Sequence, residues 1–293
     1  MSVYGYSIKL VRIGIFCFHI MESRCVHKGD NSMKRSLLEI IFMSEKRKNL
    51  LLFLREGPRR MEEILEALDV TRHALLPQIK ILSESSLVIK EKDVCRLSEI
   101  GEIVAEDMIP LIGTLTVLEE NYDYWTEHEL SSIPLPLLKR IRELGSCEII
   151  EPELSDMFDL NKDIIAQAFG SGFVFGATAF LHPSYPSLLV DLVKNGIDVS
   201  IIMTENALEK HKLDHMQELK MFLNSSSGKL YLYPNDMKLA SLFIAETFVM
   251  MCLFDRKGRY DRKDLIFRND AAINWGKELF GFYLLSSHQI MQI

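Results

Sequence analysis

The segment VTRHALLPQIKIL, residues 70–82, decides how the N-terminal part of the chain is expected to fold. Its apolar residues Leu75, Ile79 and Leu82 recur at helical spacing and form one inward stripe. Thr71 stands before this stripe and can cap the helix, because its hydroxyl accepts hydrogen bonds from backbone N–H groups that the first turn leaves free. The segment therefore predicts an amphipathic helix with one outward polar face.

Two helices are expected before this segment and a hairpin after it. Apolar residues at helical spacing predict one helix over residues 37–54, ended by a Gly-Pro pair, and a second over residues 61–68. Residues 88–90 and 94–97 are typical of two strands joined by a polar turn. This order of elements is that of a winged helix-turn-helix, whose third helix can enter the major groove of DNA. We predict such a DNA-binding domain over residues 33–100.

The outward-facing residues of the third helix and of the hairpin are the candidate DNA contacts. Arg72 can pair with guanine through two hydrogen bonds, whereas Thr71 and Lys80 suit phosphate oxygens. Pro77 lies inside this helix, where it removes a backbone hydrogen bond and should either bend the helix or disturb its first turn. The full set of predicted DNA contacts is Thr71, Arg72, His73, Leu76, Pro77, Gln78, Lys80, Lys90, Lys92 and Arg96.

The charge of the chain is divided unevenly between its parts. With 48% apolar and 26% charged residues, the chain has the composition of a soluble globular protein, and its formal net charge of −7 argues against nucleic-acid binding by the chain as a whole. Residues 33–100 nevertheless carry 13 Lys and Arg against 11 Asp and Glu, whereas residues 101–293 carry 17 against 28. The acidity thus belongs to the C-terminal two-thirds, and the predicted DNA-binding domain is mildly basic.

The cysteines and the first residues point to a protein of the cytoplasm. No two cysteines stand in a C-x-x-C pair, so a structural zinc site or a disulfide framework has little support. Residues 1–32 are expected to be a peripheral extension, or to precede the true start at Met33. Their apolar run has no small-residue cleavage site and is too short to span a bilayer, and no other segment is a candidate transmembrane helix. The five cysteines are Cys17, Cys25, Cys95, Cys147 and Cys252.

Residues 101–146 are predicted to be a helical connector or dimerisation region. Leu111, Leu115 and Leu118 belong to an apolar pattern that continues to about Trp125 and is too apolar for an isolated solvated helix. Such a helix either packs on the second domain or joins two copies of the chain. We favour a homodimer, because DNA-binding proteins of this kind usually work as symmetric dimers.

Residues 147–293 alternate between strand and helix patterns and predict an α/β domain with parallel crossovers. The fold class of the whole chain is therefore α+β and multidomain: a winged helix-turn-helix, a helical connector and a C-terminal α/β domain. The expected elements of the last domain are strands at 173–180, 198–203, 229–233, 239–244 and 247–254 and helices at 185–194, 205–223 and 271–285.

The loops after the first two of these strands are the candidate effector site, because α/β sheets bind ligands at the carboxyl ends of their strands. Polar side chains of these loops can present hydrogen-bonding groups to a small molecule. The alternative is that they are ordinary helix caps, a common role for Ser, Thr and Asn before a helix. The candidate effector contacts are His182, Ser184, Tyr185, Thr204 and Asn206.

No catalytic motif accompanies these loops. The sequence lacks G-x-S-x-G, G-x-x-x-x-G-K-[ST], G-x-G-x-x-G and the H-x-K-x-x-x-x-D sequence of phospholipase D-type enzymes. His211 and His215 have the spacing of metal ligands on a helix, but Lys212 stands where a zinc protease carries its glutamate. An exposed polar helix face explains the two histidines better. We predict no catalytic residue, no metal and no cofactor.

Four stretches resemble a known family: LLEIIFMSEKRKNLLLFL (37–54), VTRHALLPQIKIL (70–82), FLHPSYPSLLVDLVKNGIDVSIIMTEN (180–206) and NWGKELFGFY (274–283). They are similar to the winged-helix transcriptional regulators of methanogenic archaea, whose C-terminal half is a methanogenesis-regulator (FilR-type) domain. The resemblance covers roughly residues 33–285. It implies specific DNA binding by the first domain and a sensing or regulatory role for the other. It also implies that the Leu-Pro-Gln sequence at 76–78 is a common feature of the family.

The sequence therefore predicts a cytoplasmic, homodimeric transcription regulator that binds double-stranded DNA and senses a small effector. Two alternatives from other classes remain open. One is an enzyme acting on a small metabolite, with the winged helix as an accessory domain. The other is a module in which the three N-terminal helices bind a partner protein and the basic residues are a solvated face.

Overall fold

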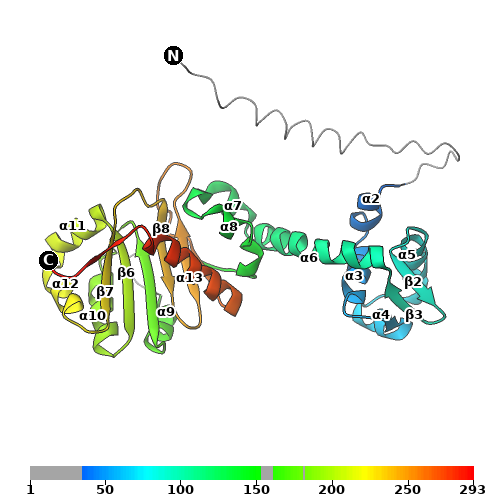
Figure 1. The fold of residues 1–293 in the computed structure, drawn as a ribbon, viewed down its shortest axis with the longest axis horizontal. Helices are drawn as coiled ribbons and strands as arrows, with labels where there is room; N and C mark the ends of the chain where they lie inside the picture. Colours follow the sequence, from blue (N-terminus) through cyan, green and yellow to red (C-terminus); the bar gives the residue numbers. More distant parts are fainter. Residues whose placement is uncertain (1–34, 153–160, 181) are drawn as a thin grey trace, which may run out of the picture. The chain divides into compact units, whose positions relative to one another are not determined.

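The computed structural model of the chain describes residues 35–152, 161–180 and 182–293 (Figure 1). The expectation that residues 1–32 form an extension lies outside these described residues. The chain divides between Ser98 and Glu99 into two compact units. Both units combine helices with strands, in agreement with the predicted mixture of α and β structure.

The N-terminal unit contains short helices and a small sheet, and the predicted hairpin follows its last helix. The strands pair antiparallel in the order β1-β3-β2, so that β2 and β3 form the expected hairpin. The elements are α2 (Leu37–Phe42), α3 (Glu45–Leu54), β1 (Arg59–Arg60), α4 (Met61–Ala67), α5 (Arg72–Glu84), β2 (Val88–Glu91) and β3 (Val94–Leu97).

The prediction of one helix over residues 37–54 is wrong, because the chain forms two helices there. Ser44 has an extended backbone and caps α3, its hydroxyl accepting from the N–H of Arg47 at 3.5 Å. A serine hydroxyl that accepts from a free N–H group of the next helix favours an extended backbone at the serine. The preceding helix therefore ends there instead of continuing. The helix α5, by contrast, continues through Pro77 without interruption.

The apolar stripe of α5 is the centre of the N-terminal core. Leu75, Ile79 and Leu82 are buried as predicted, and α5 packs against α3. Burying each such side chain contributes roughly 1.5–3 kcal/mol, so the stripe fixes the orientation of α5 and leaves its polar face outside. Other fully buried residues of this core are Leu50, Leu51, Met61, Ile64 and Leu87.

The C-terminal unit is built around an eight-stranded mixed sheet, in the order β11-β7-β6-β5-β8-β9-β10-β4. Its strands are β4 (Glu148–Ile150), β5 (Phe173–Thr178), β6 (Asp198–Thr204), β7 (Gly228–Tyr233), β8 (Leu239–Ile244), β9 (Val249–Leu253), β10 (Asp264–Phe267) and β11 (His288–Ile290). Its α-helices are α6 (Glu99–Glu120), α7 (Tyr122–Glu127), α8 (Leu135–Leu138), α9 (Lys162–Phe169), α10 (Tyr185–Lys194), α11 (Glu205–Asp214), α12 (Met216–Leu223) and α13 (Asp270–Leu284), joined by the short 3-10 turns η1 (Leu130–Ser132) and η2 (Ile141–Leu144).

The strands β5, β6 and β7 run parallel, and the other pairings are antiparallel. The predicted parallel crossovers are therefore confirmed, with α10 linking β5 to β6 and α11 and α12 linking β6 to β7. The predicted single helix over residues 205–223 is broken at His215, whose backbone leaves the helical region at φ −142° and ψ 41°. The predicted antiparallel pair also forms, as β8 and β9.

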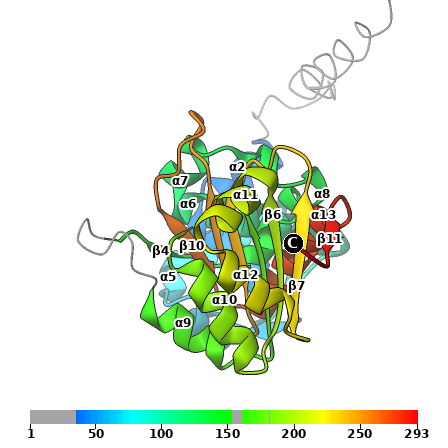
Figure 2. The same ribbon diagram turned by 90° about the vertical axis from the view of Figure 1, so that its left-hand side faces the viewer.

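The two faces of the sheet are covered by different helices (Figure 2). Apolar residues of α9, α10, α11 and α12 pack on one face, and those of α13 with residues 124–144 pack on the other. Trp275 of α13 donates a hydrogen bond from Nε1 to the carbonyl oxygen of Leu137 at 3.0 Å, and the hydroxyl of Tyr283 donates to that of Ser132 at 2.7 Å. The later part of the predicted connector is thus tied to the sheet.

Candidate functional site

The polar face of α5 carries most of the predicted DNA contacts. Thr71 caps the helix as expected, its hydroxyl accepting from the N–H of Ala74 at 3.3 Å. This cap fixes where the helix begins, and therefore which residues lie in its first turn. The predicted contacts of this helix that are exposed to solvent are Thr71, Arg72, His73, Leu76, Pro77 and Lys80.

Gln78 differs from the other predicted contacts because it holds α5 to α3. Its Oε1 accepts from Nη1 of Arg47 at 2.8 Å and from the hydroxyl of Ser44 at 3.5 Å. Arg47 is buried, and its Nε donates to the carbonyl oxygen of Ile40. A buried guanidinium needs such partners, so Gln78 has a structural role in this arrangement. Arg47 was missed by the sequence analysis, although its place on the inward side of a helix signals a buried partner.

The hairpin adds three exposed cations, Lys90, Lys92 and Arg96. Lys92 has a positive φ of 55°, in the two-residue turn that it forms with Asp93 between the strands. The carboxylate of Asp93 lies 3.5 Å from the guanidinium of Arg72. The turn of the hairpin and the first residue of α5 are therefore electrostatically linked.

The other ion pairs of this surface are also exposed. Lys80 lies 3.8 Å from Glu84, and Arg96 lies 3.5 Å from Glu91. Exposed pairs of this kind contribute at most about 1 kcal/mol, so these cations can exchange their partners for phosphate. Neither Lys90 nor Lys92 forms an ion pair with any other residue that the structure describes.

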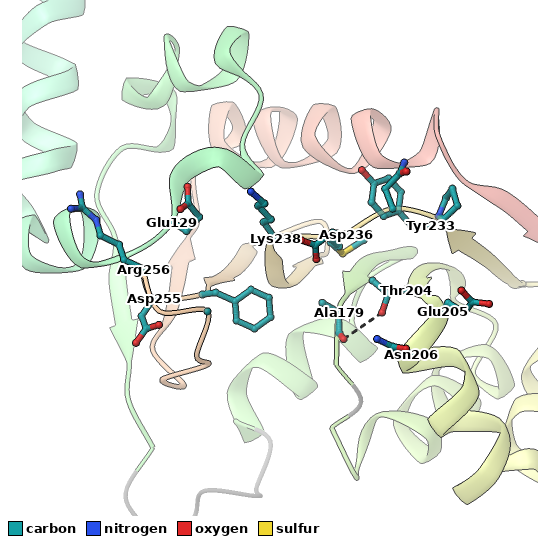
Figure 3. Close-up of a pocket in the computed structure, with 15 residues that line it drawn as sticks. Glu129, Ala179, Thr204, Glu205, Asn206, Tyr233, Asp236, Lys238, Asp255 and Arg256 are labelled. Carbon is teal, nitrogen blue, oxygen red and sulfur yellow. Dashed lines mark hydrogen bonds between the residues drawn. The ribbon is translucent and has the colours of Figure 1, made fainter.

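A cavity of about 620 Å³ opens at the carboxyl ends of β5, β6 and β7, where the sequence predicts the effector site (Figure 3). Its volume lies in the range of cavities that hold small molecules. The loops after β7 and β9 complete its walls. Its lining residues are Glu129, Ala179, Thr204, Glu205, Asn206, Tyr233, Pro234, Asn235, Asp236, Met237, Lys238, Phe254, Asp255, Arg256 and Gly258.

Two of the five predicted effector contacts, Thr204 and Asn206, line this cavity. Thr204 also caps α11, its hydroxyl accepting from the N–H of Ala207 and donating to the carbonyl oxygen of Ala179, both at 3.4 Å. His182, Ser184 and Tyr185 do not line it. Tyr185 is the first residue of α10 and Ser184 is its N-cap, so both belong to the start of this helix rather than to the end of β5.

The charged lining residues Lys238 and Arg256 were missed by the sequence analysis. They follow β7 and β9, and the sequence analysis considered only the loops after β5 and β6. A hydrogen bond from Ser131 lowers the pKa of Glu129, and the positive charges of Lys238 and Arg256 lower it further. Asp255 accepts from Nε of Arg259 at 2.7 Å, which leaves Asp236 and Glu205 as the less constrained carboxylates of the lining.

A second group of polar side chains crosses the sheet near Tyr185. Thr178, Ser241, Cys252 and Asp264 come from the neighbouring strands β5, β8, β9 and β10, and the first three are buried. Burial raises the pKa of Asp264 to about 7; a hydrogen bond from Cys252 opposes this shift, and the negative charge of Asp261 adds to it. Burial also raises the pKa of the Cys252 thiol.

The histidine pair that the sequence analysis placed on an exposed polar face is partly buried. His211 is 1% exposed, and neither of its ring nitrogens has a hydrogen-bond partner among the described residues. The rings of His211 and His215 meet edge to face, with their centroids 6.0 Å apart. The described residues contain no group of three or more His, Cys, Asp or Glu side chains able to hold a metal ion. Nor do they include a helix both long and apolar enough to cross a membrane.

Two family models match the chain. One is described as the N-terminal domain of the methanogenesis regulatory protein FilR1 and matches residues 35–116; the other is its middle domain and matches residues 157–286. A curated relative named methanogenesis regulatory protein FilR1, from Methanothrix harundinacea (strain 6Ac), is 25% identical over 259 residues. The alignment covers 86% of this chain and 58% of the relative, so the chain spans less than two thirds of the relative's length.

Two solved structures are similar in part. The archaeal chromatin protein TrmBL2 is 12% identical with a TM-score of 0.40, over 86% of this chain and 97% of the other. The phospholipase D family member Nuc from Salmonella typhimurium is 13% identical with a TM-score of 0.36, over 50% of this chain and 99% of the other. Both TM-scores lie below 0.5, and neither likeness supports a statement about function.

Proposed function

Because the chain belongs to the family of the methanogenesis regulatory protein FilR1, we propose that it is a transcription regulator that binds specific DNA as a homodimer. Residues 33–100 would form a winged helix-turn-helix that reads DNA. Residues 101–146 would connect the two domains and help to join the protomers, and residues 147–293 would sense a small effector.

The observation that carries the DNA-binding proposal is the exposed basic surface made by α5 and the hairpin. Five cations, Arg72, Lys80, Lys90, Lys92 and Arg96, lie on the two elements that would face DNA, and all are exposed. In this arrangement α5 would enter the major groove, and the lysines of the hairpin would neutralise phosphates. Gln78 is not part of this proposed surface in the free protein, because Arg47 occupies it.

The decisive experiment is genome-wide mapping of the DNA that the protein binds, followed by titration of one mapped promoter against scrambled DNA. Arg72→Ala should reduce the discrimination between the two by about 1–3 kcal/mol, the value of a bidentate base contact. Lys194→Ala, which removes an exposed cation from α10, serves as the control. Equal binding of promoter and scrambled DNA by the unaltered protein would refute the proposal.

Salt dependence separates DNA binding from the partner-protein alternative. Phosphate contacts release counterions, so the logarithm of the binding constant should fall steeply as the logarithm of the salt concentration rises. A module that binds a protein through the same face would show no such slope with DNA. Absence of the slope in a DNA titration would favour the partner-protein module.

The homodimer proposal is supported by an apolar face on α6. Ile100, Ile103, Leu111 and Leu115 lie on one side of the helix, and each is between 41% and 65% exposed. Such a face on a long helix is suited to packing against its own copy, which would set the spacing of two DNA-reading domains. The double substitution Leu111→Glu and Leu115→Glu should convert the dimer to a monomer in sedimentation experiments, whereas Glu102→Gln on the opposite side should not. A monomeric unaltered protein would contradict the proposal.

The effector proposal is supported by the 620 Å³ cavity, with Thr204 and Asn206 in its lining. Because Lys238 also lines this cavity, we expect Lys238→Ala to weaken binding of any acidic ligand there. A panel of small metabolites should contain at least one that raises the Tm of the protein and changes its affinity for promoter DNA. A compound that raises the Tm without changing DNA affinity would be a ligand but not an effector.

One observation favours the enzyme alternative: groups with raised pKa values gather around Tyr185, as in many active sites. The cause argues for a different role, because burial dominates each shift. Cys252 is fully buried, and its raised pKa keeps the thiol protonated, whereas catalysis needs the thiolate. Turnover of a metabolite by the purified protein, lost in Asp264→Asn, would establish the enzyme.

A further inference from the structure

Asp264 is partly buried, and its carboxyl group forms no ion pair with any residue that the structure describes. Its Oδ1 is shielded from solvent and has no hydrogen-bond partner among the described residues. Its one described side-chain donor is the thiol of Cys252, and the charge of Asp261, which acts on it, has the same sign. Removing a carboxylate from water is costly unless a cation compensates. The site therefore has a strong electrostatic preference for a positively charged group.

Three aromatic rings form a cluster, and two of them, those of Tyr185 and Tyr260, lie near this carboxyl group. The ring of Phe180 lies 4.5 Å from that of Tyr260 and 6.4 Å from that of Tyr185, between ring centroids. Both tyrosines lie close enough to Asp264 for its charge to raise their pKa values, in addition to the larger effect of burial. All three rings are partly exposed, so a ligand can reach them from solvent. Aromatic faces attract cations, and they do so most strongly where water is excluded.

We propose that Phe180, Tyr185, Tyr260 and Asp264 form a binding site for a small organic ammonium ion. The rings would surround its alkyl groups, and the carboxylate would balance its charge. Binding itself does not depend on the DNA-binding proposal; that this ion is the effector rests on the proposed function.

The ligand should bind only when the carboxyl group of Asp264 is ionised. Because the pKa of Asp264 lies near 7 in the free protein, a cation must displace a proton at lower pH. The affinity should therefore fall about tenfold between pH 8 and pH 6. The titratable and charged groups around Asp264 are Cys252 on β9, Tyr124 on α7, Tyr185 on α10, and Tyr260, Asp261 and Arg262 on the loop before β10.

The test is calorimetric titration of the full-length protein at pH 8 with methylammonium and tetramethylammonium chloride. Neutral tert-butanol, and sodium chloride at equal ionic strength, serve as ligand controls. We expect saturable binding of at least one of the two ammonium ions and none of either control compound. Failure of both ammonium ions to bind, or equally strong binding of tert-butanol, would overturn the proposal.

Matched variants separate the two parts of the site. Asp264→Asn keeps the shape of the side chain but not its charge, and should weaken binding at least tenfold. Tyr185→Phe keeps the aromatic face and should bind normally, whereas Tyr185→Leu should bind at least fivefold more weakly. Asp198→Asn removes an exposed carboxylate elsewhere and is the control. Unchanged affinity in both Asp264→Asn and Tyr185→Leu would show that any binding occurs at another site.

The experiments distinguish a failure of the proposed ammonium site from a failure of the proposed regulatory function. If an ammonium ion binds but promoter affinity is unchanged, the site stands and its role as effector site is refuted. If the protein does not bind promoter DNA at all, the titration with ammonium ions still shows whether this site binds an ammonium ion.

Discussion

The guanidinium of Arg72 lies 3.5 Å from the carboxylate of Asp93, which joins the first turn of α5 to the turn of the hairpin. Both side chains are half exposed, so the pair contributes little stability. It nevertheless gives Arg72 a preferred direction in the free protein. It also places a negative charge beside the proposed DNA surface, where a phosphate would be repelled.

Asp93→Asn should therefore strengthen binding to non-specific DNA. Loss of the carboxylate frees Arg72 for phosphate and removes a repulsive charge, so we expect a several-fold gain at low salt that disappears at high salt. The free energy of unfolding should fall by less than about 1 kcal/mol. Fluorescence anisotropy with scrambled DNA measures the effect, with Asp198→Asn as the charge control. Weaker non-specific binding would mean that Asp93 helps, rather than hinders, the contact.

Gln78→Ala should destabilise the N-terminal unit by about 1–3 kcal/mol. The change leaves the buried guanidinium of Arg47 without its partner at 2.8 Å, and an unpaired buried polar group costs about this much. Urea denaturation of the variant measures the loss. The exposed residue Gln217 provides the control, and Gln217→Ala should change stability by less than 0.5 kcal/mol, roughly the usual range for surface sites. Equal stability of the two variants would contradict the structural role of Gln78.

Two glycines of α13 should respond oppositely to alanine. A Cβ at Gly276 would lie 2.7 Å from Cγ2 of Val249, so Gly276→Ala should cost about 1–3 kcal/mol by overpacking the helix against β9. A Cβ at Gly281 meets no atom within 4 Å, so Gly281→Ala should stabilise by about 0.5–1 kcal/mol through helix propensity. Thermal unfolding of the two variants tests the close approach of α13 to the sheet. Destabilisation of equal size at both positions would argue against that packing.

His211 should make the protein less stable in mild acid. Burial, and then the positive charge of His215, lower its pKa to about 4, below the value near 6.5 expected in the unfolded chain. The folded state thus binds fewer protons, and stability should decline as the pH falls from about 6.5 towards 4.

The substitution His211→Leu should remove this acid sensitivity. It should also raise stability at pH 7.5 by about 1–3 kcal/mol, because two unpartnered buried nitrogens are replaced by apolar atoms. Denaturation at pH 7.5 and pH 5 compares it with His288→Leu, which alters an exposed histidine. Acid sensitivity that persists in His211→Leu would assign the effect to another group.

The sequence alone determined the elements whose signals are local. The stripe Leu75, Ile79 and Leu82, the cap at Thr71 and the limits of α10 were all predicted, because spacing and capping depend on residues within a few positions of each other. Two of the predicted effector contacts, Thr204 and Asn206, line the large cavity, since parallel strands bring their carboxyl ends to one edge of the sheet. The family resemblance came from the same local stretches.

Only the tertiary structure decided which side chains meet. Gln78 was predicted to contact DNA, yet its amide holds Arg47, 31 positions away. His182, Ser184 and Tyr185 were predicted effector contacts, yet they lie outside the lining of the large cavity. Asp264 and Tyr185 come from distant parts of the sequence, and no periodicity could place a carboxyl group near an aromatic ring across four strands. The physical reason is that local patterns fix which face of an element is buried, whereas contacts between polar groups depend on how separate elements pack.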